Sequence, residues 1–193
     1  MNNTTVGLSV EVILNTAAKL FANSGYRATS LNDVARLLNV SKPALYYHFK
    51  NKHEILSSIF TIIMDIYLEK ALEIGKLSIS PKQKLEMLIE SHALAVLNNK
   101  EYSIIFFKES IELDADSREK LNVDMKIYED IFKEVIDNGI KEGTFKNLDS
   151  NALVMGIFGM TNWLYYWFEE KGELSKEQIC NLYLTVLQTG YLK

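Results

Sequence analysis

The chain has 193 residues, of which 48% are hydrophobic and 24% charged, and its net charge is −4; this composition is typical of a globular protein long enough to bury a substantial core. Its single cysteine excludes an intrachain disulfide and any metal site built from several thiolates. No uncharged apolar run approaches the ~18 residues that span a bilayer, and the polar stretch Met1–Leu8 does not have the pattern of a secretion signal, so we expect a cytoplasmic protein with no membrane partner.

Apolar residues recur at helical spacing along most of the chain, and no stretch alternates as a strand does. The first helix is predicted by the apolar stripe from Val10 to Phe21, with Ser9 as its N-cap and Gly25 after its last turn. Further helices are predicted near 30–38, 41–49, 51–75, 80–98, 102–113, 116–142, 149–171 and 175–191. The sequence therefore predicts an all-α fold of about nine helices.

The second and third predicted helices have the spacing of a helix-turn-helix, because only Asn39-Val40-Ser41 separates them. On a helical wheel, Leu45 and Phe49 of the third helix point inwards. Its outward face holds lysine, tyrosine and histidine, and no acidic residue lies between Asp33 and Glu54. These side chains donate hydrogen bonds to phosphates, and their apolar parts pack on thymine methyl groups. The starts of the neighbouring helices add backbone N–H groups and a lysine. We predict that double-stranded DNA is contacted by Thr29, Ser30, Ser41, Lys42, Pro43, Ala44, Tyr46, Tyr47, His48 and Lys52.

The distribution of charge agrees with this prediction. Residues 1–53 hold six basic and two acidic side chains, a net charge of +4, whereas residues 54–193 hold fifteen basic and twenty-three acidic side chains, a net charge of −8. A basic segment joined to an acidic one is typical of a phosphate-binding module attached to a second part. We therefore expect a DNA-binding head at residues 1–53 and a body, residues 54–193, for effector binding and dimerisation.

Two runs within residues 10–60 match the pattern of a known family. They are Ile13-Leu14-x-x-Ala17-x-x-Leu20-Phe21-x-x-x-Gly25-Tyr26-x-x-Thr29-Ser30-x-x-Asp33-Val34-Ala35 and Val40-Ser41-Lys42-Pro43-Ala44-Leu45-Tyr46-Tyr47-His48-Phe49-Lys50-Asn51-Lys52. They closely resemble the N-terminal domain of TetR-family repressors. The resemblance implies that the third helix meets the major groove and its phosphates, while the positions of Thr29 and Lys52 hold the DNA backbone. It also implies a homodimer on a palindromic operator, released by a small-molecule effector, with no cofactor.

The last two predicted helices carry more apolar surface than a monomer exposes. Small residues permit close approach of a second helix, and two tryptophans four residues apart can bury a large area against it. We therefore predict an isologous dimer; the alternative is an intrachain core alone. The predicted interface consists of Gly156, Gly159, Met160, Trp163, Trp167, Ile179, Leu182, Tyr183, Val186 and Leu187.

The effector is suggested by a shorter resemblance. The run Gly159-Met160-x-Asn162-Trp163-x-x-x-Trp167, followed by Gly172-x-Leu174-Ser175-x-x-Gln178-Ile179, is similar to regulators of fatty-acid or sterol breakdown that sense acyl-CoA thioesters. The acidic body offers few partners for the phosphates of coenzyme A, so another apolar or aromatic molecule is the alternative. For each predicted pocket residue the alternative role is in the core. We predict a pocket lined by Met64, Met87, His92, Phe106, Phe107, Met125, Tyr128, Phe132, Asn162 and Tyr166.

Two other classes of function are alternatives to a DNA-binding regulator. An enzyme is disfavoured because the three histidines have no metal-ligand spacing and no phosphate loop or nucleophile motif is present, so we expect no catalytic residue and no metal. A helical adaptor that binds proteins instead of DNA is the second alternative. It leaves the acid-free, tyrosine-rich segment between Asp33 and Glu54 unexplained.

Overall fold

The computed structural model describes residues 8–192, and the described chain is helical almost throughout. The remaining seven residues of the Met1–Leu8 stretch, in which no secretion signal was expected, lie outside the described part. The predicted all-α class is confirmed, with one isolated bridge between Phe145 and Leu192 as the single extended pairing in residues 8–192. The elements are α1 (Val10–Ser24), α2 (Leu31–Leu38), α3 (Lys42–His48), α4 (Lys52–Gly75), α5 (Pro81–Asn98), α6 (Lys100–Lys108), the 3-10 turn η1 (Ser110–Glu112), α7 (Ala115–Lys141), α8 (Ser150–Asn162), α9 (Leu164–Trp167) and α10 (Lys176–Tyr191).

The helices begin where the sequence places its caps. At α2, the Ser30 hydroxyl accepts the Asp33 N–H at 3.3 Å and the Asp33 carboxylate accepts the Ser30 N–H at 2.9 Å, which forms a capping box. After α2 the chain turns at Asn39, whose φ of 54° lies in the left-handed region. The side chains that cap a helix N-terminus are those of Ser9, Ser30, Ser41, Asn51, Ser80, Asp114, Asp149 and Ser175.

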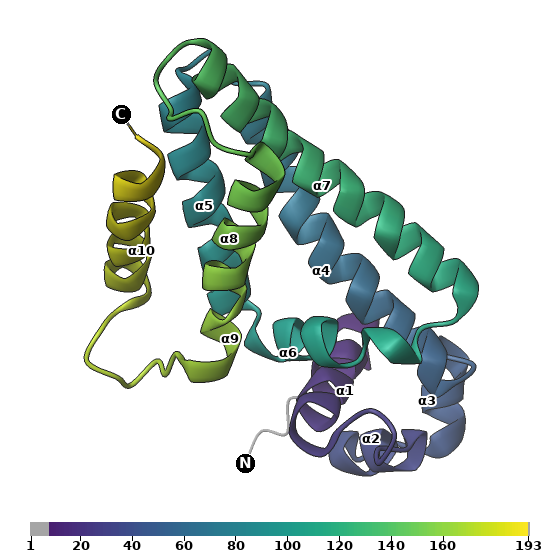
Figure 1. Ribbon diagram of the computed structural model, residues 1–193. Helices are drawn as coiled ribbons and strands as arrows, with labels where there is room; N and C mark the ends of the chain where they lie inside the picture. The colour runs from purple at the N-terminus through teal and green to yellow at the C-terminus, as the bar shows by residue number, and fades with distance from the viewer. Residues whose placement is uncertain (1–7, 193) are drawn as a thin grey trace.

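The helices form two groups that share α4. Helices α1, α2 and α3 lie together at one end of the molecule, and α4 extends from them into the body beside α7 (Figure 1). Helix α5 packs against α4, α7, α8 and α10, while α6 lies across the junction and packs on α1. The wall between head and body is therefore built from α6, η1 and the first turns of α4 and α7.

The prediction of one continuous helix over 149–171 was wrong. Helix α8 ends at Asn162 and a single turn, α9, ends at Trp167. The Thr161 hydroxyl donates to the Ile157 carbonyl at 2.7 Å, a side-chain bond that bends helices. Lys100 donates to the Phe168 carbonyl at 2.9 Å and holds the end of α9 on α6. The predicted helix 102–113 is likewise divided, into α6 and η1.

Candidate nucleic-acid interface and body cavity

Helix α3 lies on the surface of the head with the orientation that the sequence predicts. Leu45 and Phe49 are buried, whereas Tyr47 is 86% exposed. Tyr46 is also exposed, and the Lys42 ammonium lies 5.6 Å from the centre of its ring. Ser41 and Pro43 are exposed, and Ala44 and His48 are half-buried at the edges of the same face. An apolar inner face thus holds an outer face of phenols and a cation.

A groove of about 410 Å³ lies beside α3, between the starts of α2 and α4. Its walls include the basic side chains of Arg27, Lys42, Lys50 and Lys52. The groove offers a concentration of positive charge next to the tyrosines of α3, which is the electrostatic pattern that favours phosphates.

Two residues predicted to contact DNA use their hydrogen-bond donors within the protein. The Thr29 side chain is buried and its hydroxyl donates to the Gly25 carbonyl at 2.9 Å, while its N–H donates to the Tyr26 carbonyl. The Ser30 hydroxyl and N–H both donate to the Asp33 carboxylate, at 2.6 and 2.9 Å. Because no donor of either residue is left over, the expected direct phosphate contacts of Thr29 and Ser30 are not supported.

Lys52 also differs from its predicted role. Its ammonium donates to the Tyr26 carbonyl at 2.7 Å and the Thr29 carbonyl at 2.8 Å, and lies 4.1 Å from the centre of the Tyr26 ring. Partial burial lowers the pKa of Lys52, although Glu112 and Glu109 act in the opposite direction. The side chain therefore ties the loop between α1 and α2 to the first turn of α4.

The same loop is held from the body by two carboxylates that the sequence analysis did not select. Glu109 accepts the Tyr26 N–H at 3.1 Å, and Glu112 pairs with Arg27 at 2.7 Å. Both acids lie in the α6–η1 segment, which packs on α1 and continues into the body. Nothing in their local sequence marks them, because their partners are more than eighty residues away.

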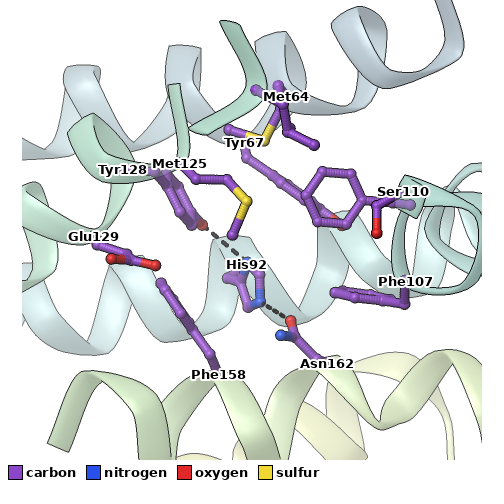
Figure 2. Close-up of a pocket in the computed structure, with 12 residues that line it drawn as sticks. Met64, Tyr67, His92, Phe107, Ser110, Met125, Tyr128, Glu129, Phe158 and Asn162 are labelled. Carbon is purple, nitrogen blue, oxygen red and sulfur yellow. Dashed lines mark hydrogen bonds between the residues drawn. The ribbon is translucent and has the colours of Figure 1, made fainter. Parts of the chain in front are cut away.

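The body contains a cavity of about 280 Å³ between α4, α5, α6, α7 and α8 (Figure 2). Seven predicted residues line it, together with five that the sequence analysis missed because their side chains also suit a core or because their helix faces were not known. The predicted lining residues are Met64, His92, Phe106, Phe107, Met125, Tyr128 and Asn162, with Phe106 and Phe107 adjacent on α6. The missed ones are Tyr67, Ser110, Leu121, Glu129 and Phe158.

Three predicted pocket residues lie elsewhere. Phe132 is fully buried and packs on His92 and Phe158 without reaching the cavity. Met87 and Tyr166 are exposed, and neither lines the cavity. Tyr166 lies outside because the break after α8 turns the following residues away from the direction that a continuous helix would give them.

His92 lies at the centre of a buried hydrogen-bonded chain (Figure 2). Its Nε2 lies 2.7 Å from the Asn162 Oδ1 and its Nδ1 lies 2.9 Å from the Tyr128 hydroxyl. An amide oxygen only accepts, so Nε2 carries the proton and Nδ1 accepts from Tyr128. Burial lowers the pKa of His92 to about 4, which keeps the ring neutral near pH 7.

Helices α8, α9 and α10 present an apolar surface to solvent. Trp163 is 53% exposed, Leu182 48% and Val186 50%. The exposed glycines Gly156 and Gly159 lie on α8, where a Cβ on either would meet nothing within 4 Å. Most residues of the predicted interface lie on this surface or at its edge. Trp167, at the end of α9, is exposed, and the half-buried residues are Met160, Tyr183 and Leu187. Ile179 is the exception, because it is 1% exposed and belongs to the core of the chain.

Comparison with known proteins identifies the family. Residues 13–59 match the model of bacterial regulatory proteins of the tetR family, and residues 78–191 match a tetracyclin repressor-like C-terminal domain. The chain belongs to the TetR family. It is therefore a DNA-binding transcriptional regulator with a helix-turn-helix, and α2 and α3 are the two helices of that motif.

Individual relatives support the same assignment. The TetR-family chain is 28% identical to the fatty acid metabolism regulator protein of Bacillus subtilis over 79% of its own length and 81% of that protein. Its fold superposes on the ketosteroid transcriptional regulator KstR2 of Mycobacterium tuberculosis with a TM-score of 0.91 at 24% identity, covering 97% of each chain. It also matches AibR, solved with isovaleryl coenzyme A and operator DNA, with a TM-score of 0.82 at 28% identity over 91% and 96% of the two chains.

These relatives are transcriptional regulators and not enzymes. In the part of the TetR-family chain that is described, no helix combines the length and apolarity needed to cross a bilayer. Nor do residues 8–192 bring together a group of three or more His, Cys, Asp or Glu side chains that could hold a metal ion.

Proposed function

We propose that this regulator is a repressor that binds palindromic operator DNA as a homodimer and releases it when a small effector enters the body. In this proposal residues 1–53 form the DNA-binding part and residues 54–193 the effector-binding and dimerisation part. The outward face of α3 carries the proposal: Tyr47, Tyr46 and Lys42 are exposed on a helix whose opposite face is buried. A groove-binding helix needs this combination of rigid inner packing and free donors.

The DNA-binding face is tested by replacing its exposed donors. Tyr47→Ala and Lys42→Ala should each weaken operator binding about tenfold in a gel-shift assay, because each removes a contact from both protomers. Lys19→Ala is the matched control, since Lys19 is an exposed cation of the head on α1, away from α3. Operator DNA is obtained by selection from a random pool. Equal affinity of all four proteins would refute the proposed face.

The homodimer is supported by the exposed apolar surface of α8, α9 and α10. Trp163, Leu182 and Val186 are each about half exposed in the protomer, and an apolar patch of this kind on a regulator with two-fold operators suits an isologous contact. A dimer would place two copies of α3 at the ~34–36 Å spacing of successive major grooves.

The oligomeric state tests this surface directly. Val186→Glu should convert the dimer into a monomer in analytical ultracentrifugation, because the contact would bury an unpaired carboxylate in both copies. Val123→Glu is the matched control, since Val123 is 54% exposed on α7 and outside the surface. A wild-type chain that sediments as a monomer, or a Val186→Glu variant that remains dimeric, would contradict the proposal.

The proposed effector is an acyl-CoA, with another apolar or aromatic molecule as the alternative. The name of the Bacillus subtilis relative and the isovaleryl coenzyme A of the AibR complex favour an acyl thioester. At about 280 Å³ the cavity is near the lower limit of small-molecule sites. It would therefore enclose the acyl group and leave the nucleotide part outside.

The α6–η1 segment is proposed to couple the cavity to the head. Phe107 and Ser110 line the cavity, while Glu109 and Glu112 of the same segment hold the loop after α1. An acyl group that displaces Phe107 and Ser110 would move both carboxylates and thereby the helix-turn-helix. Such a two-site element is what a ligand-dependent change of DNA affinity requires.

Effector binding is tested with isovaleryl-CoA and a series of longer acyl-CoAs, with free coenzyme A as the control. An acyl-CoA that fits the cavity should raise the melting temperature, because it binds the folded protein and not the unfolded chain. The same acyl-CoA should release operator DNA. Glu109→Gln with Glu112→Gln should preserve the rise in melting temperature and reduce the release. If no acyl-CoA changes either quantity, the effector is of another class.

A further inference from the structure

The Asn162 side-chain amide uses its oxygen in a hydrogen bond within the protein and leaves its NH2 group unpaired in residues 8–192. Its Oδ1 accepts the His92 N–H at 2.7 Å, and its side chain lines the cavity (Figure 2). Among residues 8–192 no hydrogen-bond partner takes the Nδ2 group, which has two donors. The amide therefore presents two hydrogen-bond donors to whatever occupies the cavity.

The orientation of this amide is determined by its buried neighbours. Among residues 8–192 the buried Tyr128 hydroxyl has one hydrogen-bond partner, His92 Nδ1, at 2.9 Å. If Nδ1 carried the proton, the Tyr128 O–H would be buried without an acceptor, so the proton is on Nε2, which itself requires an acceptor. A flipped Asn162 would place an N–H against that N–H inside a buried site, which is costly. Tyr128 and His92 thus act as positioning residues for the Asn162 donors.

The charges around the cavity restrict the acceptor further. The lining contains one ionisable acid, Glu129, and no lysine or arginine, while the burial of His92 keeps its ring neutral near pH 7. A carboxylate or phosphate inside the cavity would have no counter-ion and would face the Glu129 carboxylate. The remaining walls, which include Met64, Phe106 and Phe158, are apolar or aromatic.

We propose that Asn162 determines the specificity of the cavity by donating a hydrogen bond to an uncharged carbonyl oxygen on an apolar chain, as in a thioester or a ketone. The inference rests on the proposed function only in taking the cavity as the effector site. It selects neutral carbonyl compounds over free fatty acids and hydrocarbons of the same size.

A pair of isosteric probes tests this without coenzyme A. The probes are hexyl methyl ketone and the alkene in which a methylidene group replaces its carbonyl oxygen. Isothermal titration calorimetry on the full-length protein should show that the ketone binds about fivefold more tightly, which is the effect of one neutral hydrogen bond. Asn162→Asp keeps an oxygen for the His92 N–H and removes the amide donors, so it should abolish the preference. Asn151→Asp, an exposed change on the same helix, should leave the preference intact.

The wild-type comparison alone is decisive if Asn162→Asp does not fold. Equal affinity of the two probes, binding of neither, or a preference for the corresponding alcohol over the ketone would each overturn the inference. Operator binding and its release by acyl-CoA are measured separately in gel shifts that contain no probe. A failure of the proposed function is therefore distinguishable from a failure of the Asn162 assignment.

Discussion

Replacement of Lys52 by methionine separates a positioning role from a phosphate contact. The methylene stem is retained, while the ammonium loses hydrogen bonds of 2.7 and 2.8 Å to the Tyr26 and Thr29 carbonyls and its place over the Tyr26 ring. Hydrogen bonds to charged groups contribute about 1.5–3 kcal/mol each. Part of this is offset because methionine has no ammonium to desolvate, and partial burial already lowers the pKa of Lys52.

We expect Lys52→Met to lower the free energy of unfolding by about 2 kcal/mol, which for a chain of this length is about 4–8 °C in melting temperature. Operator affinity should fall because the loop before α2 moves. The slope of log K against log salt should stay the same, since no phosphate contact is removed. Thermal melts and gel shifts at several salt concentrations measure the three quantities.

Lys50→Met provides the contrast, because Lys50 is exposed and lines the same basic groove. It should leave the melting temperature unchanged and reduce the slope of log K against log salt by about 1.8, which is about 0.9 for each copy in the proposed dimer. A Lys52→Met variant that melts like the wild type and shows this reduced slope would refute the positioning role and restore the direct contact predicted from the sequence.

Three further outcomes are expected. Leu45→Ala should cost about 2–5 kcal/mol in urea unfolding, unlike exposed Tyr47, because Leu45 is fully buried. Burial lowers the pKa of His92 to about 4 in the folded state, so below pH 6.5 the unfolded chain binds this proton more readily than the folded chain does. The free energy of unfolding, measured in urea, should therefore fall by about 3 kcal/mol between pH 6.5 and pH 4. His92→Gln should remove this pH dependence. Gly139→Ala should destabilise by about 1–2 kcal/mol because its Cβ would overlap the Phe145 ring, whereas Gly190→Ala meets open space and should be neutral or stabilising.

Local chemistry determined much of the fold. A capping box at a helix start depends on groups only three residues apart along the chain. Ser30 with Asp33 and Ser80 with Gln83 therefore specify their capping boxes independently of tertiary contacts. The inward direction of Leu45 likewise follows from helical periodicity within seven residues. The class of fold, the helix-turn-helix and the outer face of α3 were predictable for this reason.

Residues of the cavity were predictable only in part, because an aromatic residue on an amphipathic helix suits a core and a pocket equally well. Phe132 and Phe158 have the same chemistry, yet the first is enclosed by its neighbours and the second lines the cavity. Tyr166 was misplaced because the hydroxyl of Thr161 and the distant Lys100 help to end α8 and α9 early.

What the sequence determined by itself is therefore the set of short-range features: the helices, their caps and the polarity of α3. The tertiary structure alone decided the roles that depend on partners far along the chain. The sequence predicts Lys52 as a free cation at a helix start, whereas in the fold its ammonium donates to the carbonyls of Tyr26 and Thr29. No sequence motif marks Glu109, and only the fold brings its carboxylate to the Tyr26 N–H, where it links the body to the head. A side chain's free donors depend on what surrounds it, and only folding brings those surroundings together.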